Sequence, residues 1–174
     1  MAKRHERTHA RRCALQVLYT SEIQGAYPSV VASSERFLSE DGDLPDYAQK
    51  LIEGVEAHQI EIDRMLTSTS ENWALARMPI VDRSILRLAV FEMFHCDDVP
   101  VSVSINEAVE LAKGFGGEDD SPRFVNGVLG RIARSMEGDG AGAADAVGAD
   151  IAAAGPVDAL VGASGAAACV QVGV

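Results

Sequence analysis

Several features that identify common protein classes are missing from this sequence. No apolar run reaches the roughly 18 residues that a membrane-spanning helix requires, and no apolar segment follows the charged first residues as it would in a secretory signal. The cysteines, Cys13, Cys96 and Cys169, are three in number and widely scattered, which argues against a disulfide framework. We therefore expect a reduced, cytoplasmic protein that makes no contact with a membrane.

The motifs of common enzyme classes are missing as well. The sequence has no phosphate-binding P-loop, no dinucleotide-binding glycine pattern after a strand, and no nucleophile turn of the G-x-S-x-G type. The acidic run at 118–120 precedes an expected helix start, where the helix dipole stabilises negative charge. His5, His9 and Cys13 recur on one helix face, but a structural zinc site takes about four ligands, and no second pair lies nearby. We expect no catalysis, no cofactor and no bound metal.

The pattern of apolar residues predicts a single helical domain. Aromatic residues make up 5% of the 174 residues and hydrophobic residues 47%, so we expect a core of aliphatic side chains and alanine. Apolar residues recur at helical spacing between prolines and glycines that begin and end helices. About seven helices are expected, at 4–24, from 28, 46–66, 73–77, 79–95, 104–113 and 121–136. The expected fold class is all-α.

Two details of these helices lead to specific expectations. Ser104 and Glu107 have the Ser-x-x-Glu spacing of a capping box, so we expect a helix to begin at Ser104 after an extended connector. Asp82 and Glu92, on the helix that follows Pro79, are most simply solvent-facing charges. Both expectations place these polar side chains at helix ends or on helix surfaces.

Charge is distributed unevenly along the chain. The net charge is −11, but residues 1–12 carry five basic side chains against one acidic side chain, Glu6. We call residues 3–12 the basic arm, which makes an anionic partner compatible with an acidic protein. From residue 138 onward the chain is rich in alanine and glycine and carries four aspartates without a basic residue. We expect a helical domain at 1–137 and a disordered tail at 138–174.

The residues around the last helix leave two functions open. Arg123 and Phe124 follow a helix-start pair, Ser121 and Pro122. An arginine beside an aromatic ring suits single-stranded RNA, which is held by phosphate contacts and base stacking. Phe124 also fits the apolar stripe of its helix, where it would be a core residue. The acidic surface fits a different function, that of a helical adaptor that binds a basic protein.

Four segments, in this order along the chain, resemble the bacterial NusB family of transcription antitermination proteins. They are Ala-Arg-Arg-Cys-Ala-Leu-Gln-Val-Leu-Tyr at 10–19, Val-Asp-Arg-Ser-Ile-Leu-Arg-Leu-Ala-Val-Phe-Glu at 81–92, Ser-Ile-Asn-Glu-Ala-Val-Glu-Leu-Ala-Lys-Gly-Phe-Gly at 104–116, and Phe-Val-Asn-Gly-Val-Leu-Gly at 124–130. The resemblance covers roughly residues 4–136. A related domain precedes the catalytic part of some ribosomal RNA cytosine methyltransferases. We expect the stand-alone factor here, with a non-catalytic relative of that RNA-binding domain as the alternative.

The resemblance implies a NusB-like helical bundle of two packed three-helix halves. It implies binding of the single-stranded boxA element of ribosomal RNA operon leader transcripts, together with the ribosomal protein that serves as NusE. That assembly would help RNA polymerase to read through terminators, and the polymerase and other Nus factors would be contacted indirectly. The resemblance also allows a homodimer that masks the RNA face.

Candidate site residues follow from the family's motif positions. On the RNA side the resemblance implies Arg7, Arg11, Tyr19, Asp120 and Phe124, to which charge and proximity add Arg4, Arg12, Lys113 and Arg123. On the partner side it implies Asp82 and Glu92. Thr8 and His9 interrupt the run of arginines that is common in the first helix of the family.

Overall fold

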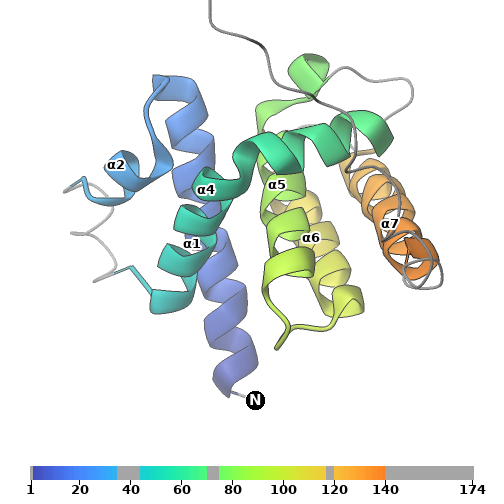
Figure 1. The fold of residues 1–174 in the computed structure, drawn as a ribbon. Helices are drawn as coiled ribbons and strands as arrows, with labels where there is room; N and C mark the ends of the chain where they lie inside the picture. The colour runs from blue at the N-terminus through green and yellow to red at the C-terminus, as the bar shows by residue number, and fades with distance from the viewer. Residues whose placement is uncertain (1, 35–43, 70–74, 117–119, 140–174) are drawn as a thin grey trace, which may run out of the picture. The chain divides into compact units, whose positions relative to one another are not determined.

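The computed structural model describes residues 2–34, 44–69, 75–116 and 120–139, and it contains helices and no strand in these ranges (Figure 1). The elements are α1 (Ala2–Gln24), α2 (Pro28–Ala32), α4 (Asp46–Thr69), the 3-10 turn η1 (Leu75–Arg77), α5 (Ile80–His95), α6 (Val101–Phe115) and α7 (Ser121–Asp139). The predicted all-α fold is confirmed. The segment Met1–Ala141 forms one compact unit.

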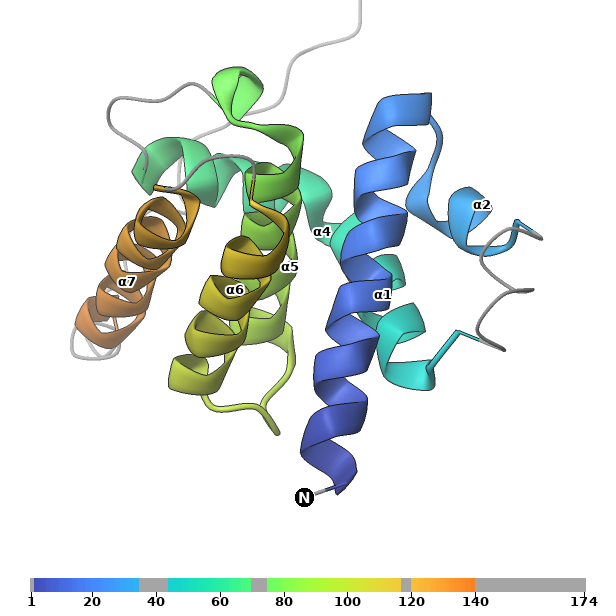
Figure 2. The same cartoon turned by 180° about the vertical axis from the view of Figure 1, so that it is seen from behind.

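The helices pack as two groups of three. In one group α1, α2 and α4 lie against one another, and in the other group α5, α6 and α7 do so (Figures 1 and 2). The groups are joined because α4 and α1 both pack on α5, and α4 also reaches α7. The arrangement agrees with the expected two three-helix halves.

Prolines and one glycine define several helix ends. Gly25 follows α1 with a φ of 63°, a left-handed conformation that glycine adopts at little cost. Pro28 opens α2, where its missing N–H has no intrahelical partner to lose. Pro79 and Pro100 occupy the N-cap positions of α5 and α6. The helices therefore begin and end close to the positions that the sequence predicts, with α6 as the exception.

The start of α6 corrects a prediction. The helix begins at Val101, directly after Pro100, and not at Ser104. Ser104 and Glu107 lie one turn inside the helix with 1% and 8% of their surface exposed, so they do not form a capping box. The carboxylate of Glu107 instead accepts a hydrogen bond of 2.8 Å from the hydroxyl of Thr8 on α1. The polar spacing arises because α6 packs a carboxylate against α1.

Helix α5 lies at the centre of the bundle and packs on α1, α4, α6 and α7. Most of its side chains from Ser84 to Met93 are buried around the whole circumference. Phe91 extends from it against Gly54 of α4, where a Cβ would come within 1.9 Å of the phenyl ring. The glycine is required for this close approach of the two helices.

A network of ion pairs joins α1, α4 and α5 away from the basic arm. Arg87 donates two hydrogen bonds to Asp63, of 2.7 and 2.8 Å, and both Arg83 and Arg87 pair with Glu22. Burial alone would raise the pKa of Glu22, but the two guanidinium groups outweigh it and lower that pKa. The paired geometry is bidentate at Asp63, which is the stronger form of an arginine–carboxylate contact.

Some predictions fall outside the described residues. They concern the residues that would continue the second helix after 34, the turn around Trp73, the acids at 118–119 and residues 140–174. The division at 137 and the disorder expected for 138–174 therefore stay predictions, although α7 itself continues to Asp139.

Candidate nucleic-acid interface

The two sides of α1 divide its candidate residues into an exposed and a buried set. Thr8, Arg12 and Tyr19 are separated by four and seven residues, so they form one stripe along the helix. Thr8 hydrogen bonds to Glu107 of α6, which places this stripe next to α6. Arg12 is exposed and Tyr19 is 40% exposed, about 10 Å further along the helix. Arg12 and Tyr19 therefore present a cation and an aromatic ring to solvent.

Arg11 lies on the buried side of α1, with only 2% of its surface exposed. Its guanidinium group donates to the carboxylate of Glu92 at 2.9 and 2.8 Å and pairs with Glu107 at 3.2 Å. Tyr47 of α4 donates its hydroxyl to the same oxygen of Glu92. Because a buried charge is tolerated when it is paired, these contacts hold α1 against α5 and α6. The geometry leaves Arg11 little surface for an external ligand.

Arg7 lies one turn before Arg11 and bridges α1 to the turn between α5 and α6. It pairs with Asp98, and its guanidinium carbon lies 4.8 Å from the centre of the Tyr47 ring, within cation–π range. The hydrogen bond to Asp98 raises the pKa of Arg7, and the same contact lowers the pKa of Asp98. Burial, followed by the hydrogen bond to Glu92, raises the pKa of Tyr47, so the phenol keeps its proton. The side chain of Arg4 lies outside the described residues.

A pocket of about 530 Å³ lies where the basic arm meets the start of α6. Its lining combines charged side chains with apolar ones: Arg7, Arg11, Asp98, Val99, Pro100, Val103, Asn106 and Glu107. Val103 is 38% exposed at the pocket. The pocket offers an apolar wall next to the paired side chains of Arg7 and Asp98.

The first turn of α7 carries the second group of candidate residues. The hydroxyl of Ser121 donates a hydrogen bond of 2.9 Å to the buried carboxylate of Asp82 on α5, which fixes the start of α7. Asp120 and Arg123 are exposed. Phe124 is partly buried and packs against the hydrophobic core, so its ring has both a core contact and accessible surface. The position of Phe124 is therefore compatible both with a core residue and with a contact to RNA.

The exposed side of α6 connects these two groups. Lys113 is exposed and pairs with Glu110 at 2.7 Å, so its charge is partly neutralised. Phe115, in the last turn, is 41% exposed. Sequence analysis did not select Phe115, although its place between Gly114 and Gly116 separates it from the apolar stripe of α6. An exposed aromatic ring at a helix end is a candidate for base stacking.

The candidate residues do not gather at one point. Figure 2 shows α1, α6 and α7 side by side, with the start of α1 and the start of α6 at one end and the start of α7 at the other end. The pairing of Arg7 with Asp98 fixes the first end. At the second end, a Cβ on Gly116 would lie 2.7 Å from the Cβ of Ser121. We call this surface the α1–α6–α7 face, and its length suits an extended strand better than a compact ligand.

The two candidates for the partner side are buried, which corrects the expectation that they face solvent. Asp82 is 3% exposed and Glu92 is 1% exposed. The physical reason is that each carboxylate meets a polar group of another helix: Ser121 at Asp82, and Arg11 with Tyr47 at Glu92. The helical pattern in the sequence shows that a polar residue lies next to an apolar stripe. It does not show that a residue of another helix will form a hydrogen bond or ion pair with that side chain and so allow its burial.

Two further observations concern metals and membranes. In the described residues, the side chains of His58, Glu61 and His95 lie close enough together to hold a metal ion. The sequence prediction missed this group, since its only local signal is the i, i+3 spacing of His58 and Glu61 on α4. Within the ranges that the structure covers, no helix combines the length and apolarity needed to cross a membrane.

Comparison with known proteins identifies relatives over the helical domain. The NusB family model matches residues 8–134. The transcription antitermination protein NusB of Saccharopolyspora erythraea is 50% identical over 131 residues, which cover 73% of this chain and 86% of that protein. The NusB of Nocardioides sp. is 45% identical over 130 residues, which cover 74% of this chain and 94% of that protein. These relatives are named as antitermination proteins and not as enzymes, in agreement with the predicted lack of catalysis.

Solved structures agree with the sequence relatives. NusB of T. maritima superimposes with a TM-score of 0.67 at 34% identity, over 74% of this chain and 90% of that one. A chain from the crystal structure of antitermination factors NusB and NusE in complex with dsRNA gives a TM-score of 0.65 at 28% identity, over 75% of this chain and 98% of that one. Because the sequence match extends over nearly all of both three-helix halves, this chain belongs to the NusB family.

Proposed function

We propose that this protein is a transcription antitermination factor that binds the boxA element of ribosomal RNA operon leader transcripts. It would bind this RNA together with the ribosomal protein that serves as NusE, and it would act in the cytoplasm. It would contact RNA polymerase and the other Nus factors indirectly, through this complex. The observation that carries the proposal is the similarity to a chain solved with NusE and RNA, at 28% identity over 98% of that chain. The exposed cations and rings of the α1–α6–α7 face support it.

On this proposal, phosphate contacts and base contacts are divided between different residues. Arg12 and Arg123 are exposed and supply positive charge at two places on the face. Tyr19, Phe115 and the accessible edge of Phe124 supply rings on which unpaired bases can stack. Stacking suits single-stranded RNA because bases in a loop or strand are free to leave their neighbours.

The remaining RNA-side candidates have supporting roles in the proposal. Arg7 and Arg11 position α1 through Asp98, Glu92 and Glu107. Lys113 and Asp120, both exposed, would tune the local potential on either side of the glycines between α6 and α7. Arg4 would extend the positive charge of the basic arm along the RNA.

The partner-side residues act through the helices that they anchor. Asp82 fixes the start of α7 through Ser121, and Glu92 fixes α1 through Arg11. A surface for the ribosomal protein would then depend on both carboxylates without exposing either of them. A homodimer that covers the α1–α6–α7 face would compete with RNA and is part of the same proposal.

Binding of boxA RNA and of a scrambled RNA of equal length and composition tests the function, each with and without the ribosomal protein. The expected result is tighter binding of boxA than of the scrambled RNA, with the difference increased by the protein partner. The affinity should also fall with salt, since phosphate contacts release counterions. Arg64→Ala removes an exposed cation from α4, a helix that is not part of the α1–α6–α7 face, and serves as the charge-matched control.

Two outcomes would contradict the proposal in different ways. Equal affinity for boxA and scrambled RNA in the presence of the partner would leave a non-specific RNA-binding protein. Capture of the ribosomal protein without any RNA binding would favour the helical adaptor, which the acidic surface supports through its net charge of −11. A Arg64→Ala variant that weakens RNA binding as much as Arg12→Ala would show that RNA does not use the α1–α6–α7 face.

A further inference from the structure

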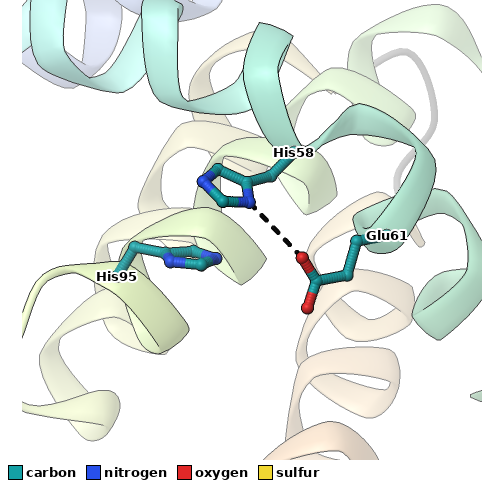
Figure 3. Close-up of side chains that lie close together, drawn as sticks. All are labelled: His58, Glu61 and His95. Atoms are coloured by element: carbon teal, nitrogen blue, oxygen red, sulfur yellow. Dashed lines mark hydrogen bonds and ion pairs between the residues drawn. The ribbon is translucent and has the colours of Figure 1, made fainter.

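Three side chains with metal-binding atoms meet between α4 and α5. His58 and Glu61 are three residues apart on α4 and therefore share a helix face, and His95 is the last residue of α5. One ligand atom from each of the three lies within 4.8 Å of the other two. Figure 3 shows the three side chains pointing toward one another across the gap between the two helices. The two helices also meet through the pairing of Arg87 with Asp63 and the hydrogen bond from Tyr47 to Glu92, and here they converge on two imidazoles and a carboxylate.

The spacing of His58 and Glu61 fits a metal ion as well as it fits a hydrogen bond. The Nδ1 atom of His58 lies 3.3 Å from the Oε2 atom of Glu61. A hydrogen bond between nitrogen and oxygen is usually 2.9–3.0 Å long. In a tetrahedral zinc site with metal–ligand distances near 2.0–2.1 Å, neighbouring ligand atoms are about 3.3 Å apart. The pair on α4 therefore already has the separation of two ligands of one zinc ion.

His95 contributes a buried nitrogen that lacks a partner in the described part of the chain. Its Nε2 atom is inaccessible to solvent and makes no hydrogen bond there. A buried polar atom without a partner destabilises a fold, and such an atom calls for a water or an ion that would satisfy it. Its ring is held by stacking, with the centre 4.0 Å from that of His58 and 5.0 Å from that of Phe91.

The surroundings of His95 favour its neutral form. Burial, and then the neighbouring His58, lower the pKa of His95. The neutral imidazole is the form that binds a metal. Glu61 from α4 and Asp97 from the turn after α5 act in the opposite direction on that pKa and supply negative charge for a cation.

We propose that His58, Glu61 and His95 form a binding site for one divalent transition-metal ion, with zinc as the best fit. Two imidazoles and one carboxylate form a ligand set that zinc uses when a fourth position stays open to water. The ion would tie α4 to the end of α5. That end leads directly into the turn in which Asp98 holds Arg7, so the metal would stabilise the surface on which the basic arm docks.

A second potential set of ligands provides an internal control. Cys13 and His9 on α1 approach each other, with the sulfur 3.6 Å from the Nε2 atom of the ring, and His5 lies one turn earlier on the helix. His5 and His9 are exposed and complete the four histidines of the chain. Removing them should leave the proposed site intact.

Calorimetric titration of the chelator-treated full-length protein with zinc sulfate tests the site, alongside thermal melting with zinc and with EDTA. We expect one zinc ion to bind per chain. Zinc should raise the melting temperature, and EDTA should return it to the value of the metal-free protein. His95→Phe preserves the stack on Phe91 but removes the nitrogen, and should weaken binding by at least about 100-fold, the upper end of what loss of a supporting contact costs. Glu61→Gln, at an exposed position, should weaken it by at least about tenfold.

The control variant carries both His5→Ala and His9→Ala and should bind zinc as the unchanged protein does. Melting in EDTA shows whether each variant folds. If His95→Phe does not fold, Glu61→Gln still tests the site. Absence of zinc binding by the unchanged protein would overturn the proposal, and so would binding without a rise in melting temperature. Undiminished binding by His95→Phe or Glu61→Gln would overturn it too. Loss of binding in the control variant would move the site to α1.

Discussion

Gly54 of α4 lies directly against the ring of Phe91 of α5, and a Cβ at position 54 would come within 1.9 Å of that ring. The two helices on either side of this contact join the two halves of the bundle. The close approach therefore sets how the halves meet, and it leads to a clear expectation for substitution.

Gly54→Ala should lower the free energy of unfolding by about 1–3 kcal/mol, because the added methyl group overpacks the contact with Phe91. Urea denaturation measures the change. Gly127→Ala is the matched control, since no atom lies within 4 Å of a Cβ at that helical position. The control should be stabilising by about 0.5–1 kcal/mol, because alanine is the better helix former. Equal effects of the two substitutions would contradict the assigned role of Gly54.

Arg11 and Arg12 are neighbours in sequence, but their replacement should affect the stability of the protein to very different extents. Arg11→Met leaves the buried carboxylate of Glu92 without its cation, so stability should fall by about 3–5 kcal/mol. Arg12→Ala should change stability by no more than about 0.5 kcal/mol, as expected for an exposed side chain.

The same pair separates stability from RNA binding. Arg12→Ala should weaken binding of different RNA sequences about equally and reduce the salt dependence of binding by roughly one counterion. Salt titrations of boxA binding provide the measurement. A stable Arg11→Met protein, or an Arg12→Ala protein with an unchanged salt dependence, would show that the division of α1 into a buried and an exposed set is wrong.

Phe124 and Phe115 offer a test of stacking at the other end of the α1–α6–α7 face. Phe124→Ala should lower both thermal stability and RNA affinity, because the ring packs on the core and keeps an accessible edge. Phe115→Ala should preserve stability and weaken RNA binding by about 1–3 kcal/mol, the cost of losing one stacked base. Circular dichroism melting and an RNA titration distinguish the two effects. RNA affinity unchanged in both variants would remove stacking at this end.

The ion pairs at Glu22 predict a pH-dependent contribution to stability. The folded protein has a lower pKa for Glu22 than the ordinary value of 4.5, so the folded state binds the proton less readily than the unfolded state does. The contribution is fully present above the ordinary pKa and is lost as the pH falls through the folded pKa. Glu22→Gln should therefore destabilise the protein at neutral pH, and the difference from the unchanged protein should close in acid.

Urea denaturation at a series of pH values below and above 4.5 measures that difference. Glu6→Gln changes an exposed carboxylate on the same helix and should affect stability little at any pH. A difference for Glu22→Gln that persists unchanged in acid would show that its charge does not carry the effect.

Local sequence signals predicted most of the helix ends. Gly25, Pro28 and Pro79 each impose a backbone conformation or remove a donor regardless of what the rest of the chain does, so their effect can be inferred from position alone. Ser104 and Glu107 failed as a signal for the opposite reason. Their spacing is that of a capping box, but Pro100 begins the helix one turn earlier and Glu107 meets Thr8, a residue 99 positions away.

The candidate site was predictable to a similar extent. Family motifs point to α1, and the period of the helix then separates Arg12 and Tyr19 from Arg11 once the buried side is known. The buried side is set by Glu92 and Glu107, which lie on two other helices. Sequence spacing cannot reveal such pairs, because the loops between helices decide which faces meet. The same reason hid the approach of His95 to His58 and Glu61.

The contacts of α1 have a consequence for the order in which the newly made chain can fold. Arg11 pairs with Glu92, which lies 81 residues later in the chain, and Thr8 donates a hydrogen bond to Glu107, which lies 99 residues later. At the usual 5–20 residues per second of protein synthesis, the ribosome needs roughly 4–20 s to make those partners. During that interval Arg11 would lack the two carboxylates that it pairs with in the folded bundle. Among the described helices, α1 is made first but completes its contacts only after α5 and α6 have been made, so its folding is tied to that of the second half of the bundle.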